Sequence, residues 1–389
     1  MNIYNTILDK MITFEQIINS SVELNNQKKY IGYHCIFVPE EILHAAGFTP
    51  IRLFPTSRSN QYIENIFHTR SCEFVRRLAQ DFLNDKFYFL KGMLFSSCCD
   101  ALKALYDRLS EHGRMPVFHI NNFKYTSCTK QDKSPDFQEE FFMLEYRKLT
   151  EKLCKYYRVE ITDQALASTL SIYRQNRMLL KRLQEYYHLN KINKAEYYKI
   201  VQSGYCIRKE EHNIILNKIL NYFKEESSPT STCLSKDNKK TPIFLVGNIN
   251  ANHDHFIQYL NQLGIEVVED DLCGFSRYFQ PMDSGKYSMS NPYKVLYHEN
   301  KVKWCPIKAT TLHRVDNLVN KYHQSNAKGI IFTIFQYCDI QQVDYALLKI
   351  ELTKRNIPSL LIRSQPLGSN TAPLDTRISA FLEMINIHD

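Results

Sequence analysis

The chain has 389 residues, of which 44% are hydrophobic and 23% are charged, and its formal net charge is +8. This length is enough for two or three domains, each with its own hydrophobic core. The modest charge, the lack of any Lys/Arg block and the lack of any apolar run near the roughly 20 residues that span a bilayer argue against nucleic-acid and membrane proteins.

The first part of the chain predicts a helical leader and then an α/β unit. Residues 1–30 have a weakly amphipathic helical pattern, and the α/β unit follows in residues 31–136. In that unit apolar runs alternate with helical patterns, each near Gly or Pro, which is typical of a parallel sheet. The predicted helices are 39–46, 73–84 and 100–109, and the predicted strands are 49–54, 92–96 and 116–120.

The rest of the chain predicts a helical segment and a second α/β unit. Residues 137–224 have apolar side chains at helical spacing and no strand signal, and the Ser/Thr/Pro/Lys-rich residues 225–240 read as a linker or surface loop. Residues 241–389 form the second unit. Its predicted strands are 242–246, 265–268, 329–334 and 358–362, and its predicted helices are 255–263, 314–322, 345–354 and 376–385.

A Cys-Asp step follows a predicted buried strand twice, at Cys99-Asp100 and at Cys338-Asp339, and a helical pattern follows each step. Ligands of open α/β sheets bind at the carboxyl ends of the strands. A thiol at a helix N-terminus has a lowered pKa and readily becomes a thiolate ligand or nucleophile. The two steps therefore predict one cofactor held between two α/β units, and their similar surroundings suggest a structural duplication.

The 11 cysteines predict reduced thiols, some of them metal ligands. Their number is odd, the chain is not small and its beginning lacks an export pattern, so we expect a cytoplasmic protein without a disulfide framework. No C-x-x-C occurs, which argues against zinc ribbons and ferredoxin-type clusters. Ordinary thiols are expected at Cys128, Cys154, Cys206, Cys233 and Cys305.

A series of motifs extends over nearly the whole chain in a fixed order. They are Gly32 to Gly47, Cys72 to Arg76, Ser97 to Asp100, Val267 to Cys273 with Arg277-Tyr278, Cys338-Asp339 with Asp344-Tyr345, and Thr376 to Glu383, in which Ser379 replaces a Glu. The series resembles the 2-hydroxyacyl-CoA dehydratase D-component family, which includes dehydratase subunits, subunits of ATP-dependent benzoyl-CoA reductase and double-cubane cluster proteins.

The resemblance implies an α/β fold with two flavodoxin-like parallel-sheet domains, an added helical segment and an iron–sulfur cluster in the cleft between the domains. The cluster is a [4Fe-4S] cubane with three Cys ligands and an open iron, or a double cubane. Four residues are candidate ligands: Cys35, Cys72, Cys99 and Cys338. Which of them is left out of a single cubane stays open. The neighbouring Cys98 is expected to point away from the cleft, and Cys273 to pack against the second sheet.

By the same resemblance, the chain is an iron–sulfur subunit of a lyase that eliminates water from a 2-hydroxyacyl-CoA through a ketyl radical. A separate ATP-dependent activator supplies the electron, and a related subunit or a second copy completes the enzyme. The chain lacks the G-x-x-x-x-G-K loop, so ATP hydrolysis is expected to belong to the activator. The alternatives are a reductase of the double-cubane or benzoyl-CoA type and a non-catalytic cluster-bearing scaffold or electron-transfer subunit.

Three polar residues have both a structural and a functional interpretation. Glu41, in the first turn of a predicted helix, either stabilises the helix dipole or moves protons near the substrate. His34 is either a surface residue or a donor next to the cluster. Arg377 is expected to contact a neighbouring carboxylate rather than a phosphate.

Overall fold

The computed structural model describes residues 3–19, 29–56, 63, 66–122, 135–225, 240–248, 253–280, 289–303, 305–306, 311–364 and 371–386. Within these residues the chain forms two separate four-stranded sheets, and all strands within each sheet are parallel. Cys128, Cys233 and nearly all of the expected linker, residues 226–239, lie outside the described residues.

The two sheets have the same strand order. The first contains β1 (Tyr30–Tyr33), β2 (Thr49–Arg52), β3 (Leu90–Ser96) and β4 (Val117–Ile120) in the order β2-β1-β3-β4. The second contains β5 (Thr241–Gly247), β6 (Ile265–Leu272), β7 (Gly329–Phe335) and β8 (Ser359–Ser364) in the order β6-β5-β7-β8. This order begins the flavodoxin-like series, so the predicted fold of two parallel-sheet domains is confirmed.

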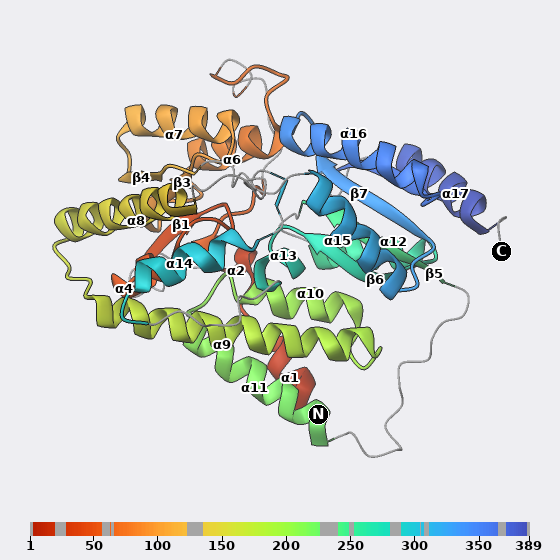
Figure 1. Cartoon of the computed structure of the whole chain (residues 1–389), viewed down its shortest axis with the longest axis horizontal. Helices are drawn as coiled ribbons and strands as arrows, with labels where there is room; N and C mark the ends of the chain where they lie inside the picture. Colours follow the sequence, from red (N-terminus) through yellow and green to blue (C-terminus); the bar gives the residue numbers. More distant parts are fainter. Residues whose placement is uncertain are drawn as a thin grey trace.

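Helices cover both sheets, as all-parallel sheets require. The first domain contains α4 (Glu40–Ala45), α6 (Glu73–Leu83) and α7 (Asp100–His112). The second contains α12 (His253–Gln262), α13 (Ser276–Phe279), α14 (Pro292–Lys301), α15 (Thr311–Gln324), α16 (Asp339–Lys354) and α17 (Ala372–Asn386). In Figure 1 the first sheet lies on the left and the second on the right.

Strand β1 is the one strand of the first sheet that the apolar pattern does not predict. It has only four residues, and Gly32 interrupts its apolar side chains. A Cβ atom on Gly32 would lie 2.8 Å from methyl groups of both Leu53 and Leu90, so a larger residue there would require these two side chains to move. Its place at the centre of the sheet is thus set by packing.

The helical segment joins the two domains. It consists of α8 (Pro135–Tyr157), α9 (Asp163–His188), α10 (Lys194–Ser203) and α11 (Lys209–Glu225), as its helical spacing predicts. The long helix α9 packs against α4 of the first domain and against α13 and α14 of the second, while α10 packs against α12. The short helices α1 (Ile3–Asp9) and α2 (Phe14–Ile18) form the leader, and α1 packs on α11.

His212 is a fully buried histidine between α9, α10 and α11. Its Nδ1 accepts a hydrogen bond from the Asn176 amide at 2.9 Å, and its Nε2 donates to the Ile200 carbonyl at 3.1 Å. A second proton would have to sit on Nδ1, where it would face the amide donor. Burial, with the nearby Lys209 ammonium, lowers the pKa of His212 to about 3.

This histidine gives a testable pH dependence. Because its folded-state pKa lies below the unfolded value of about 6.5, the unfolded chain takes up a proton first as the pH falls. The folded state is therefore expected to lose stability steadily from about pH 6.5 towards about pH 3. The slope of the unfolding free energy against pH is proportional to the number of protons that unfolding takes up. In a His212→Gln variant this number should be smaller by about one. Urea titrations between pH 4 and 7 measure both slopes, and equal slopes would contradict the assignment.

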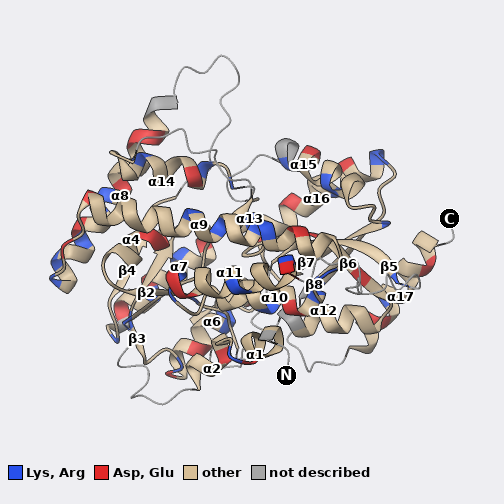
Figure 2. Cartoon of the chain, turned by 90° about the horizontal axis from the view of Figure 1, so that it is seen from below, with Lys and Arg blue, Asp and Glu red and all other residues tan. Residues whose placement is uncertain are grey.

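None of the described helices is long and apolar enough to cross a membrane. In the view of Figure 2, Lys and Arg positions are interspersed with Asp and Glu positions along the helices.

Candidate functional site

A cavity of about 670 Å³ lies where the carboxyl ends of the central strands of the two sheets meet. In each sheet the strand order reverses between the two central strands, which is where open α/β folds bind their ligands. Four lining residues show this origin: Cys35 follows β1, Cys99 follows β3, Asn248 follows β5 and Cys338 follows β7. The binding edges of the two domains therefore face each other across one cavity.

Seven cysteines of the described chain line this cavity. They are Cys35, Cys72, Cys98, Cys99, Cys273, Cys305 and Cys338. The structure thus brings together all four cysteines that the sequence proposes as ligands, although Cys35 and Cys338 lie 303 positions apart. The described Cys154 and Cys206 do not line it, in agreement with the ordinary role expected for them.

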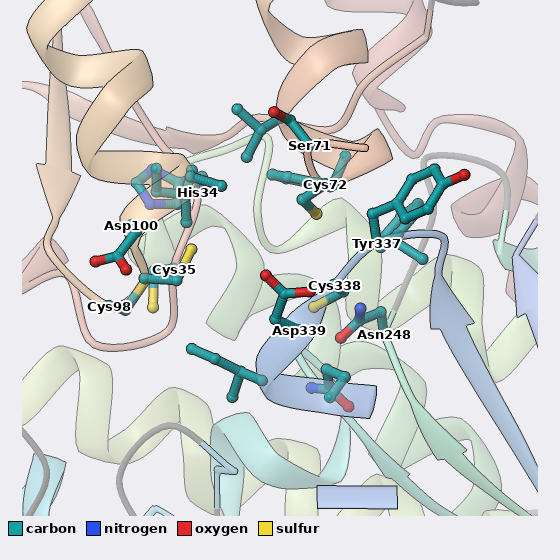
Figure 3. Close-up of a pocket in the computed structure, with 18 of the residues that line it drawn as sticks. His34, Cys35, Ser71, Cys72, Cys98, Asp100, Asn248, Tyr337, Cys338 and Asp339 are labelled. Carbon is teal, nitrogen blue, oxygen red and sulfur yellow. The ribbon is translucent and has the colours of Figure 1, made fainter. Parts of the chain in front are cut away.

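The thiols form two groups within the cavity. Cys72 and Cys338 are in hydrogen-bond contact with each other, and Cys98 is in contact with both Cys35 and Cys99. Figure 3 shows Cys35 beside Cys98 on one side, and Cys72 facing Cys338 on the other. The hydrogen bond from Cys338 lowers the pKa of Cys72, and the hydrogen bond from Cys98 lowers that of Cys99.

Helix N-termini converge on the same cavity. Cys72, Cys99 and Cys338 occupy the N-cap positions of α6, α7 and α16. The unpaired N–H groups and the dipole at a helix N-terminus favour a negative charge there. Backbone amides of the first turn contribute to the lowered pKa values of Cys72 and Cys99. At Cys338 the contact with Cys72 and burial raise the pKa well above its usual value, although a backbone amide at Gln341 opposes this. The three helix N-termini therefore favour an anionic group bound in the cavity.

Direct contacts between the domains fix the distance between the two halves of the cavity. The Glu73 N–H donates a hydrogen bond to the Gln336 carbonyl at 2.9 Å, next to Cys72 and Cys338. The rings of Phe74 and Phe335 lie 5.3 Å apart beside this bond. The start of α6 is thereby tied to the turn before α16, and Cys72 is held against Cys338.

The structure corrects the expectation that Cys98 points away from the cleft. That expectation assumed regular alternation of side chains, but β3 ends at Ser96 and the Cys98 N–H donates to the Ser96 carbonyl at 2.7 Å. The turn places Cys98 in the cavity lining together with Cys99. Its contacts with Cys35 and Cys99 raise the pKa of Cys98 well above its usual value.

Cys273 and Cys305 also line the cavity, a position that the sequence did not predict for them. Cys273 follows β6, and its sulfur accepts a hydrogen bond from Arg52 Nη2 at 3.0 Å across the domain boundary. Its position at the end of the motif Val267 to Cys273 could have marked it in the sequence as a residue of the site. Cys305 lies in an irregular segment after α14, where no local pattern marks it.

Two buried hydrogen-bond donors of the first domain, His34 and Arg52, line the cavity. The sequence pattern did not indicate Arg52 as a site residue. His34 is buried beside Phe95, and burial lowers its pKa to about 3. Neither ring nitrogen of His34, nor the Nε and Nη1 of Arg52, has a hydrogen-bond partner among the described residues. The surface interpretation of His34 is therefore wrong. Both residues offer unused polar atoms beside the cysteines.

Glu41 lies apart from these residues. It is not among the described residues that line the cavity; its carboxylate is buried and accepts a hydrogen bond from Arg177 at 3.0 Å. A role in proton transfer stays a prediction, and the structure shows a buried ion pair. The Arg377 guanidinium donates to the Leu361 carbonyl at 2.6 Å, so the carboxylate partner expected for it is not the contact observed.

The residues around the cavity fit an iron–sulfur cluster. Thiolates are the usual protein ligands of such clusters, and the unused donors of His34 and Arg52 match the N–H groups that surround cluster sulfurs. No group of three or more His, Cys, Asp or Glu side chains in the described chain converges as a site for one metal ion.

The fold and the cavity define a two-domain α/β protein with a cysteine-lined site between its domains. A family model for the 2-hydroxyglutaryl-CoA dehydratase D-component matches residues 35–385, and the chain belongs to this family. It is 23% identical to the (R)-phenyllactyl-CoA dehydratase beta subunit of Clostridium sporogenes over 98% of both chains. It is 23% identical to the beta subunit of lactoyl-CoA dehydratase of Anaerotignum propionicum, over 92% of both chains. Its identity to a benzoyl-CoA reductase subunit of Thauera aromatica is 22%, over 94% of this chain and 93% of the relative.

Proposed function

We propose that the chain is the iron–sulfur subunit of a 2-hydroxyacyl-CoA dehydratase-type enzyme. The observation that carries the proposal is the convergence of cysteines from both domains on one cavity at the two sheet ends. Family membership and the dehydratase names of the relatives support this substrate class. A [4Fe-4S] cluster would be held by three of Cys35, Cys72, Cys99 and Cys338.

When bound, such a cluster supplies one-electron transfer and, at an iron without a protein ligand, a Lewis-acid position for a substrate oxygen. The chain's own residues have separate tasks around it. Cys72, Cys99 and Cys338 present thiolates from helix N-termini, and the contacts between Phe74 and Phe335 help to close the cavity from the side. His34 is held neutral by burial and offers one N–H to the occupant.

The proposal includes three partners. A separate ATP-dependent activator supplies the electron, because the sequence lacks a phosphate-binding G-x-x-x-x-G-K loop. A related subunit or a second copy of this chain completes the enzyme, since the relatives are named as subunits of larger enzymes. The third partner is an acyl-CoA thioester with a 2-hydroxyl group.

Turnover should depend on these partners. The anaerobically purified chain alone is expected to convert no 2-hydroxyacyl-CoA, and dehydration should appear only with activator, ATP, a low-potential reductant and a sister subunit. Product formation from (R)-lactoyl-CoA or (R)-phenyllactyl-CoA, followed by chromatography, measures this dependence. Rapid dehydration by the chain alone, without ATP or reductant, would contradict the mechanism. A loaded but inactive protein in every mixture would favour the cluster-bearing scaffold.

A second candidate is a reductase of the double-cubane or benzoyl-CoA type. The specific observation in its favour is that seven thiols line the cavity, more than the three that one open cubane uses. Iron and sulfide analysis separates the two: about four irons per chain indicate one cubane and about eight indicate two. Serine variants of Cys98, Cys273 and Cys305 sharpen the test. Each should keep its iron if the protein holds one cubane on the four candidates, and lose about half of it if the protein holds two.

A further inference from the structure

Arg52 is a buried cation at the edge of the cavity. It is the last residue of β2, only 3% of its surface is exposed, and it lines the cavity. Its guanidinium carbon lies 5.6 Å from the ring centre of Phe54 and 5.1 Å from that of Tyr205. Its Nη2 donates to the Cys273 sulfur at 3.0 Å. The aromatic rings and β2 hold the guanidinium in one place.

The charge of Arg52 has no acidic partner in the described part of the chain. None of the ion pairs found there includes Arg52, and its Nε and Nη1 have no hydrogen-bond partner. A buried charge without a partner is costly, so buried cations in proteins are normally paired. Burial opposes the charge of Arg52 and the Cys273 sulfur beside it favours that charge, so the compensating negative charge is expected on this sulfur and on the occupant of the cavity.

A comparison with the other cations nearby singles out Arg52. Arg277, close to Cys273 and Cys305, is also buried, but it donates to the Asp271 carboxylate at 2.8 Å. Arg70 and Lys103 line the same cavity but are exposed to solvent. Their charges are screened by water and salt. Arg52 thus combines full burial, a cavity cysteine as its hydrogen-bond acceptor in place of a carboxylate, and a position in the lining.

We propose that Arg52 is a positioning residue that compensates the negative charge of the cavity's occupant and orients the Cys273 thiol towards it. This rests on the proposed function, in which the occupant is a thiolate-bound iron–sulfur cluster. Reduction adds one negative charge to such a cluster, and a fixed cation nearby favours the reduced state. Arg52 therefore raises the reduction potential of the bound cluster.

Three variants of the full chain, purified anaerobically, test this role. Arg52→Met removes the charge and keeps much of the apolar stem, while Arg52→Lys keeps the charge. Arg70→Met is the matched control, because it removes a cation from the same cavity at an exposed position. Iron and sulfide content and the midpoint potential from a redox titration followed by electron paramagnetic resonance are measured for each variant.

Arg52→Met is expected to have a more negative midpoint potential. The reduction equilibrium constant should fall at least about tenfold, which corresponds to ~59 mV for one electron. Arg52→Lys and Arg70→Met should stay near the wild-type value. Loss of iron from Arg52→Met alone, with iron retained in the other two, would also support the charge role. An unchanged potential in Arg52→Met, or equal loss of iron from both Arg52 variants, would overturn it.

The same measurements distinguish failure of the proposed iron–sulfur function from failure of the proposed role of Arg52. A wild-type protein that takes up no iron under these conditions would overturn the cluster proposal, and the role of Arg52 with it. A wild-type protein that loads normally, beside an Arg52→Met variant with the same iron content and potential, leaves the cluster in place and removes only the role of Arg52.

Discussion

Cys99→Ser and Cys338→Ser proteins purified anaerobically are expected to lose most of their iron and their visible sulfur-to-iron absorbance. Each substitution removes a thiolate from a helix N-terminus that faces the cavity, one from each domain. A hydroxyl is a poor ligand for iron in such clusters, which are held by thiolates. Because the two residues come from different sheets, loss of either one should detach the cluster from one half of the cavity.

Cys154→Ser is the matched control for these variants. Cys154 is partly exposed, as Cys99 and Cys338 are, but it lies on α8 and does not line the cavity. This variant should keep the iron content of the wild-type protein. Iron and sulfide analysis with absorption spectra of all three variants measures the effect. Full iron retention in both Cys99→Ser and Cys338→Ser would reject these ligands.

Arg177→Met is expected to destabilise the protein by about 3–5 kcal/mol, the range for breaking a buried ion pair from one side. Arg177 on α9 donates to Glu41 of α4 at 3.0 Å and to Glu299 of α14. All three side chains are buried, so the substitution leaves the Glu41 carboxylate without its ion-pair partner, while Glu299 keeps only its contact with Arg174. The ion-pair cluster connects the helical segment with both domains, and its loss should weaken all three parts.

The control for this variant is Arg108→Met on α7. Arg108 pairs with Glu111 at 3.5 Å, but 57% of its side chain is exposed, so the change should stay within about 0.5 kcal/mol. Urea unfolding followed by circular dichroism compares the two variants with the wild type. Adding Glu41→Gln to Arg177→Met should restore part of the loss, because it removes the carboxylate charge that Arg177→Met leaves unpaired. Equal unfolding midpoints for Arg177→Met and Arg108→Met would refute the estimate.

The sequence by itself determined the class of fold and the two central ligand candidates. β7 is a continuous buried run and β3 has a buried apolar core, and Cys99 and Cys338 come shortly after the two strands at the N-cap positions of α7 and α16. These features depend on neighbours in the chain, so periodicity and capping rules predict them. The ordered motifs between Gly32 and Glu383 pointed to the family, which the match over residues 35–385 shows.

Only the tertiary structure decided which other residues share the cavity. The direction of Cys98 depends on a turn after β3 rather than on strand alternation, and Cys305 lies in a segment without a local pattern. Arg52 is an ordinary strand-end residue in the sequence, yet folding places it 3.0 Å from a sulfur that is 221 positions away. Such contacts form when two separate sheets meet, and no rule that reads neighbouring residues contains that information. The sequence therefore specified the two sheet ends that carry Cys99 and Cys338. The packing of one domain against the other decided which further residues line the cavity, and placed the Arg52 charge beside it.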